Sequence, residues 1–247
     1  MYDNVTVNGI VLDTSLLKEY DKRLVILTAE LGKITVFANG ARRKNSQFTA
    51  VSQKFVMGSF TVHPGRNAYT LVSADIKENF IELSYDIEKM SYASYACEVL
   101  QAFSEEGIGA KDELNLLYVT FKAIINARQD LRLIKSVFIL KLLDIEGLGL
   151  QMERCVKSDT CENLHHISLK DGGMICDAVV HKVNGARSIS DDAIYAIRFV
   201  LSRDIASVYS FDISINVLDE IEKLSNDYLT MHSERTFKSL DILKGLL

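Results

Sequence analysis

The spacing of apolar residues changes near residue 79, and this change constrains the fold more than any other feature of the sequence. Residues 5–79 contain five short runs in which apolar and polar positions alternate or β-branched residues predominate, with glycines between the runs. Beyond residue 79, apolar positions recur every three or four residues. Alternation is typical of β-strands, and the longer spacing is typical of amphipathic helices. The sequence therefore predicts a two-domain α+β protein with a small closed β-barrel followed by a helical domain.

A segment of different character interrupts the predicted helices. Residues 150–186 lose the helical spacing and contain three of the four cysteines, together with histidines and an Asp-Gly-Gly turn. Ser190, followed by two aspartates, is a good N-terminal cap for the helix that comes next. We expect four segments: a barrel at 1–79, the first part of a helical domain at 80–149, a Cys/His hairpin insertion at 150–186, and the second part of the helical domain at 187–247.

The composition of the 247-residue chain is that of a globular protein, with 48% hydrophobic and 25% charged residues. No stretch approaches the roughly eighteen apolar residues that a membrane span requires. The N-terminus carries acidic residues, whereas a signal peptide begins with cations and an apolar run. The cysteines are too few and too clustered for a disulfide framework. These features predict a cytoplasmic protein without a membrane association.

The net charge of -5 conceals an uneven distribution. Residues 1–79 carry ten Lys/Arg against seven Asp/Glu, whereas the rest of the chain carries eighteen against twenty-six. A basic first third can bind a polyanion, because binding depends on local charge more than on total charge. Ordinary scatter of charges would explain the same numbers.

The motifs of common enzyme classes are absent from the sequence. It has no phosphate-binding loop, no dinucleotide-binding glycine motif after a strand, no His-Glu-x-x-His and no nucleophile elbow. Its five histidines do not suggest an acid/base site. The sequence therefore favours a binding protein over an enzyme and predicts no nucleotide cofactor.

Cations and aromatic residues are interspersed through the predicted barrel. Small barrels bind single strands with cations on the phosphates and aromatic faces on the bases, each stack contributing roughly 1–3 kcal/mol. Two simpler interpretations remain open: the phenylalanines form the barrel core, and the cationic loop at 42–44 is a solvated surface loop without a binding role. The candidate DNA-binding residues are Lys22, Arg23, Lys33, Arg42, Arg43, Lys44, Lys54 and Arg66.

The insertion carries a candidate metal site. Cys155, Cys161 and Cys176 are the candidate ligands of one structural zinc ion, with His165 or His166 as the fourth. Two Cys-x-x-Cys pairs would need cysteines at positions 158 and 179, which hold serine and valine, so a metal-free hairpin with buried thiols is the alternative. A metal hydrolase is disfavoured, because thiolate-rich sites without a nearby carboxylate base are usually structural. Cys97 lies on an apolar helix face and is expected in the core.

Several short motifs occur in a fixed order along the chain. They are the Glu-x-Asp-Lys step at 19–22, the Thr-x-Glu-x-Gly-Lys turn at 28–33, the Gly-Ala-Arg-Arg-Lys loop at 40–44, the Gln-x-Phe step at 53–55, and the segments 138–155, 168–176 and 235–243. In these motifs and in their order, the chain resembles the RecO family, which comprises bacterial mediator proteins of the RecF recombination and repair pathway. The resemblance covers nearly the whole chain.

The resemblance implies an OB-fold barrel and a helical domain with a zinc-ribbon-like insertion. It also implies binding of single- and double-stranded DNA, annealing of complementary strands, and help in loading the recombinase onto strands coated by single-stranded DNA-binding protein. The implied partners are RecR and the acidic C-terminal tail of that coating protein, the implied location is the bacterial nucleoid, and no catalytic activity is implied. The alternative is an OB-fold adaptor that binds only proteins, with its basic loop contacting an acidic partner.

The acidic tail would require an apolar groove with a cation at its rim, because a carboxylate that leaves water must be paired. Residues 130–147 offer this combination, with apolar positions at Leu133, Val137, Phe138 and Leu140 and cations at Arg132 and Lys135. The alternative is that the apolar positions belong to the helical core and the cations to its solvated face. We name Arg132 and Lys135 as candidate partner-binding residues.

Overall fold

The computed structural model describes residues 3–233 and 235–244. The chain divides into two compact units, Met1–Ile125 with Phe237–Leu247, and Asn126–Thr236. No helix of the described residues is long and apolar enough to cross a membrane.

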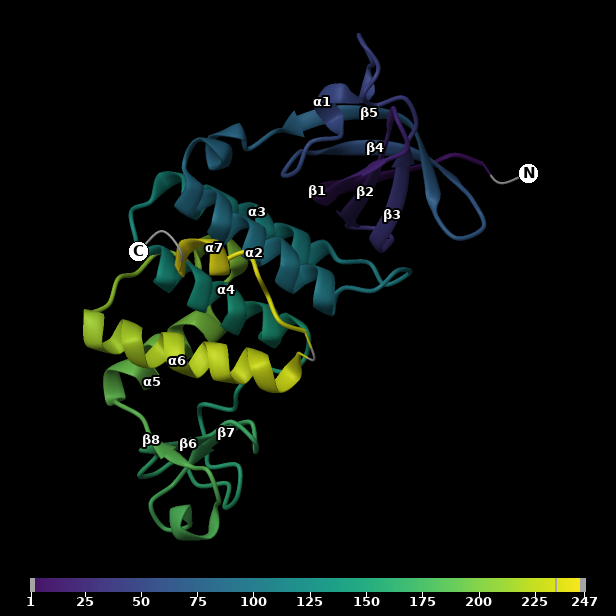
Figure 1. The fold of residues 1–247 in the computed structure, drawn as a ribbon. Coiled ribbons are helices and arrows are strands. Elements are labelled where there is room, and N and C mark those ends of the chain that lie inside the picture. Colours follow the sequence, from purple (N-terminus) through teal and green to yellow (C-terminus); the bar gives the residue numbers. More distant parts are fainter. Residues whose placement is uncertain (1–2, 234, 245–247) are drawn as a thin grey trace. The chain divides into compact units, whose positions relative to one another are not determined.

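The first unit contains a closed barrel of five strands, which confirms the predicted architecture (Figure 1). The strands follow the order β1-β2-β3-β5-β4 around the barrel, and all neighbours are antiparallel except β3 and β5. Alternate residues of the strands point inward and form a buried core that includes Val7, Ile26, Val36 and Phe60. The strand bounds are Val5–Leu17 (β1), Asp21–Thr28 (β2), Gly32–Ala38 (β3), Met57–Pro64 (β4) and Tyr69–Glu78 (β5), with the short helix α1 (Phe48–Val51) before β4.

Two helices of the same unit pack beside the barrel. A 3-10 helix, η1 (Ile81–Tyr85), precedes α2 (Ile87–Phe103), which begins where the Asp86 carboxylate accepts hydrogen bonds from the Glu88 and Lys89 backbone N–H groups. Helix α3 (Lys111–Asn126) runs beside α2, and Lys89 Nζ donates to the Ile125 carbonyl at 2.8 Å. The sequence predicts one long helix or two abutting ones from residue 79, whereas a turn of 3-10 helix separates β5 from α2.

The expected boundary after residue 79 lies inside this compact unit. Phe80 is fully buried, and its ring contacts Tyr118 and Phe121 of α3 edge to face. Lys122 of α3 forms an ion pair with Glu78 at the end of β5, at 2.8 Å. The C-terminal segment returns to the same unit, where Phe237 contacts Tyr95 of α2. Barrel and helices therefore share buried contacts across residue 79.

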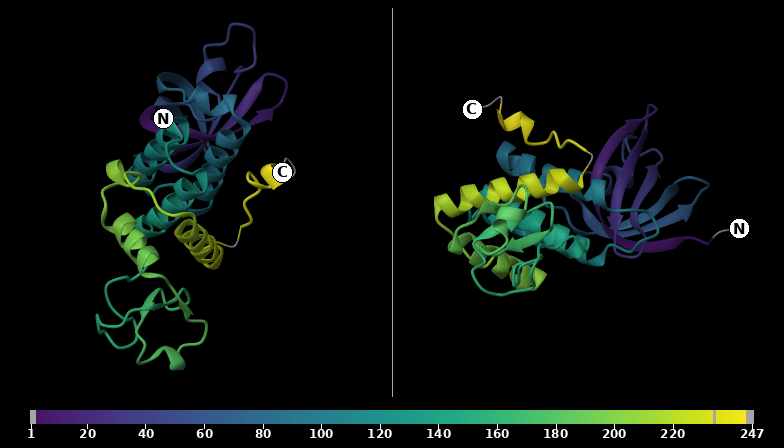
Figure 2. Two further views of the ribbon diagram at one scale, coloured as in Figure 1. Left: turned by 90° about the vertical axis from the view of Figure 1, so that its left-hand side faces the viewer. Right: turned by 90° about the horizontal axis from the view of Figure 1, so that it is seen from below.

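The second unit combines three helices with a small sheet (Figures 1 and 2). Helices α4 (Leu131–Ile145), α5 (Asp191–Ser202) and α6 (Ile215–His232) contact one another. The predicted cap at Ser190 is confirmed, since its side chain accepts a hydrogen bond from the Ala193 N–H at 3.2 Å. Between α4 and α5 lie β6 (His166–Ser168), β7 (Gly173–Ile175), the 3-10 helix η2 (Val180–Lys182) and β8 (Arg187–Ser188), and η3 (Ile205–Ser207) follows α5. The sheet order is β7-β6-β8.

Candidate nucleic-acid interface

The basic loop after β3 is held against the turn between β1 and β2. Gly40, at a φ of +69°, donates its N–H to the Asp21 carboxylate at 2.7 Å. The Arg42 N–H donates to the Tyr20 carbonyl at 2.9 Å, and its guanidinium donates to the Glu19 carbonyl at 3.0 Å. Two loops that are distant in sequence thus form one end of the barrel.

Arg42, Arg43 and Lys44 are exposed at this end of the barrel. The Arg43 guanidinium lies over the Tyr20 ring, 5.6 Å from its centroid, and the Tyr20 side chain is 43% exposed. This arrangement offers a flat aromatic face beside cations, which suits a base together with its phosphate. Both interpretations of the loop at 42–44, a DNA-binding loop and a solvated surface, require exposed side chains, and the structure has them exposed.

Lys22 joins the same group of charges. Its ammonium donates to the Ser52 carbonyl at 3.0 Å. Burial and, to a smaller degree, the positive charge of Arg42 lower the pKa of Lys22. We call this surface the loop cluster and define it as Lys18, Tyr20, Lys22, Arg42, Arg43 and Lys44. Its five cations outnumber the two carboxylates of the same turn, Glu19 and Asp21.

Tyr20 and Lys18 were not among the residues predicted from the sequence. Both are exposed in the turn that connects β1 to β2. A single aromatic residue in a short turn gives no periodic signal, and only the contact with Arg43 marks Tyr20 as part of the site. The sequence signal that could have identified Tyr20 is its position directly before the Asp-Lys step at 21–22.

Two residues continue the loop cluster along the outer face of the barrel. Arg23 pairs in register with Phe37 across β2 and β3, and its guanidinium is 3.4 Å from the Thr35 hydroxyl. The Phe37 ring is half-buried, whereas Phe55 and Phe60 are buried in the first unit. The barrel-core interpretation thus holds for Phe60, whereas Phe55 is buried against Phe121 of α3 and Phe37 presents a partly accessible face beside a cation.

Three predicted DNA-binding residues lie apart from the loop cluster. Lys33 sits at the opposite end of β3, where its ammonium donates to the Gln101 carbonyl of α2 at 2.6 Å. The Lys54 ammonium donates to the Ser94 hydroxyl, also on α2, at 3.0 Å. Arg66 is exposed in the β4–β5 turn, which precedes Tyr69. Because Tyr69 pairs in parallel with Val36, this turn lies toward the Gly32 end of β3.

The cysteines of the insertion do not gather as the candidate zinc site requires. Cys155 and Cys176 are buried, but the Cys161 side chain is exposed. Among the described residues, no three His, Cys, Asp or Glu side chains are grouped so that they could hold a metal ion. His165 and His166 instead both direct Nδ1 toward the Asp177 carboxylate, at 3.0 and 3.3 Å.

Two of the thiols have contrasting environments. Burial by itself raises the pKa of Cys155, but hydrogen bonds from the Ser158 hydroxyl and from the backbone N–H groups of Cys176, Lys157 and Ser158 outweigh it and lower the pKa to about 6. Cys97 is fully buried on α2, and this burial raises its pKa to about 12. The prediction that Cys97 belongs to the core is confirmed.

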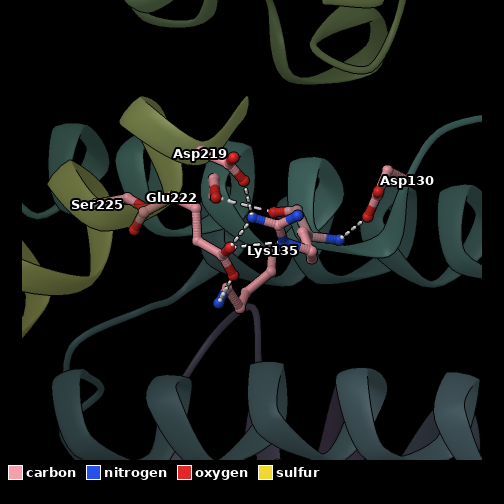
Figure 3. Close-up of polar contacts among 7 residues, drawn as sticks. Asp130, Lys135, Asp219, Glu222 and Ser225 are labelled. Carbon is pink, nitrogen blue, oxygen red and sulfur yellow. Dashed lines mark hydrogen bonds and ion pairs between the residues drawn. The ribbon is translucent and has the colours of Figure 1, made fainter. Parts of the chain in front are cut away.

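The candidate partner-binding cations of α4 are held in ion pairs within the second unit (Figure 3). Lys135 Nζ and Arg132 Nε contact opposite oxygens of the Glu222 carboxylate on α6, each at 2.6 Å. Arg132 also donates to Asp219, one turn earlier on α6. These bonds to Asp219 and Glu222 raise the pKa of Arg132. The Lys135 side chain is only 7% exposed, so it does not form the solvated rim that the sequence suggests.

The apolar residues proposed to line a groove on α4 lie in the core of the second unit. Leu133, Val137, Phe138 and Leu140 are each at most 2% exposed. The alternative interpretation of these positions therefore describes the folded protein correctly. A role of Arg132 and Lys135 in partner binding stays a prediction, and it would require a partner to displace the carboxylates of α6.

Comparison with known proteins assigns both halves of the chain to one family. The family model described as Recombination protein O N terminal matches residues 1–80, and the one described as Recombination protein O C terminal matches residues 84–241. A DNA repair protein RecO from Alkaliphilus metalliredigens is 31% identical over 98% of this chain and 99% of the relative. Proteins of the same name from Clostridium perfringens and Acetivibrio thermocellus are 30% and 29% identical, over 96% and 97% of this chain and 96% of each relative.

Proposed function

The chain belongs to the RecO family of DNA repair proteins, and from this premise we propose that its barrel binds DNA at the loop cluster and brings complementary strands together. Its general role is in DNA repair and recombination. The observation that supports the proposed site is one anchored surface on which Arg42, Arg43 and Lys44 are exposed and the Arg43 guanidinium lies over the exposed Tyr20.

Electrostatics accounts for annealing at such a site. Two complementary strands repel each other through their phosphates, and a protein that neutralises phosphates on both strands lowers this repulsion. The loop cluster supplies cations whose backbone is fixed by hydrogen bonds to the β1–β2 turn, so less loop freedom is lost on binding. In this proposal the protein needs no nucleotide and catalyses no covalent step.

The proposal extends to the replacement of the coating protein on single strands. The acidic tail of single-stranded DNA-binding protein would hold this chain close to the strand that must be vacated, and RecR would act with it in loading the recombinase. If the tail binds at α4, its carboxylates compete with Glu222 and Asp219 for Arg132 and Lys135. A protein with this role works in the bacterial cytoplasm, at the nucleoid.

An annealing assay tests the proposed function. Two complementary labelled oligonucleotides are mixed with the purified chain, and the rate of duplex formation is followed by energy transfer at low and moderate salt. We expect faster annealing with the wild-type chain and little acceleration with a variant in which Arg42, Arg43 and Lys44 are all glutamate. Absence of oligonucleotide binding even at low salt would contradict the proposal and favour a protein-binding adaptor.

Tyr20 provides a prediction about base stacking. Tyr20→Ala should weaken single-strand binding by about 1–3 kcal/mol, roughly 5- to 150-fold, because a stacking face is lost. The salt dependence should stay unchanged, since no phosphate contact is removed. Titrations with a fluorescent oligonucleotide at several salt concentrations measure both quantities. Tyr20→Phe keeps the ring and should bind like the wild type, so an equal loss in both variants would contradict the stacking role.

A further inference from the structure

Two turns of the insertion each contain a backbone hydrogen bond of the same type, from the N–H of the fifth residue to the carbonyl of the first. In the first, the Asp159 N–H donates to the Cys155 carbonyl at 2.9 Å. In the second, the Val180 N–H donates to the Cys176 carbonyl at 3.2 Å. Each turn starts with a buried cysteine, and its fourth residue is Ser158 in the first turn and Val179 in the second. The two turns therefore agree in length, in this hydrogen bond and in the position of the thiol.

The two turns also face each other. The Val156 N–H donates to the Met174 carbonyl at 2.9 Å, which ties the first turn to the strand that leads into the second. The Ser158 hydroxyl lies 3.3 Å from the Cys176 sulfur, and Ser158 also contributes to the lowered pKa of Cys155. The fourth residue of the first turn thus contacts the thiol that starts the second turn.

Facing turns with ligands at their first and fourth positions have the spacing of a tetrahedral thiolate zinc site. The groups at these four positions here are two thiols, one hydroxyl and one isopropyl group. A neutral serine hydroxyl is a poor zinc ligand, and valine has no lone pair to donate. The exposed Cys161 and the histidines at Asp177 do not complete the set. The donor set does not fit zinc.

We infer that the Ser158–Cys176 contact joins the two turns of the insertion instead of a zinc ion, and that positions 158 and 179 alone separate the insertion from a zinc-binding site. Val179 is half-buried and Ser158 is exposed, so a cysteine fits at each position without filling a closed core. The backbone of both turns is already in place, which leaves the side chains as the missing element.

Metal analysis of the full chain tests this inference. After exposure to zinc and desalting without a chelator, the wild-type chain should retain far less than one equivalent, and a chelator should not change its unfolding. Ser158→Cys with Val179→Cys should retain about one equivalent, because four thiolates then occupy the four positions. With cobalt in place of zinc, the double variant should show the charge-transfer absorption of tetrahedral thiolate coordination.

A control variant tests whether Cys161 takes part in metal binding. Cys161→Ser should leave the metal content unchanged in the wild type and in the double variant, since Cys161 is exposed. A wild-type chain that retains one equivalent of zinc would overturn the inference, whatever the variants do. A double variant that has the wild-type circular dichroism spectrum but binds neither zinc nor cobalt would overturn the claim that two positions suffice.

Discussion

Replacing Arg42, Arg43 and Lys44 with glutamate is expected to weaken binding of an unstructured oligonucleotide by a hundredfold or more at about 0.1 M salt. Each phosphate contact releases counterions, so the loss of three contacts should also reduce the slope of log K against log salt by roughly two to three units. Fluorescence titrations at several salt concentrations give both values. The barrel should remain folded, because these three side chains are exposed.

A matched variant controls for the change in total charge. Lys170, Lys182 and Lys223 are exposed in the second unit, and their replacement by glutamate changes the net charge by the same amount. This control should keep most of the affinity and an unchanged slope. If both triple variants lose affinity equally, binding depends on the overall charge of the chain and the loop cluster is not the interface.

The second large effect concerns the stability of the second unit. Glu222→Ala should lower its free energy of unfolding by about 3 kcal/mol, because Lys135 becomes an unpaired cation that is largely shielded from water. Hydrogen exchange of α4 and α6 under increasing denaturant measures this loss separately from the stability of the barrel. Asp219→Ala removes a carboxylate that is 60% exposed and should cost at most about 1 kcal/mol.

Two further measurements identify the cause of that loss. Lys135→Met in the Glu222→Ala background removes the unpaired cation and should recover most of the stability. Burial opposes ionisation of Glu222, but its bonds to Lys135 and Arg132 prevail and lower its pKa. The wild type should therefore exceed Glu222→Ala in free energy of unfolding by the whole amount at pH values above the unfolded glutamate pKa of about 4.3. This difference should shrink as the pH falls through the lower pKa of folded Glu222. A difference that does not change with pH would contradict an ionic origin.

The sequence predicts the barrel well because each strand carries its own periodic signal. Inward positions such as Ile26 and Val36 alternate with outward ones, and this alternation requires no knowledge of distant contacts. The start of α2 was harder to predict, because Phe80 and Leu83 continue the helical spacing through a 3-10 turn. There the fold depends on burial against α3, which is distant in sequence.

The roles of the cations depend even more on distant partners. Lys33 and Lys54 look like solvated strand and loop residues, but carbonyl and hydroxyl groups of α2 accept their hydrogen bonds. Lys135 looks like a surface residue of an amphipathic helix until Glu222, far along the chain, is placed beside it. Only the run at 42–44 could be recognised as exposed from local composition, and it is the part of the predicted site that the structure keeps together with Lys22.

Photocrosslinking tests the location of the DNA most directly. A single-stranded oligonucleotide that carries photoreactive bases is irradiated with the full wild-type chain, and the crosslinked peptides are identified by mass spectrometry. If the loop cluster is the interface, crosslinks concentrate in peptides that contain Tyr20, Phe37 and the loop at 42–44, and Tyr20→Ala removes those at the β1–β2 turn. Crosslinks confined to the second unit, with none in the barrel, would contradict the assignment of DNA binding to the loop cluster.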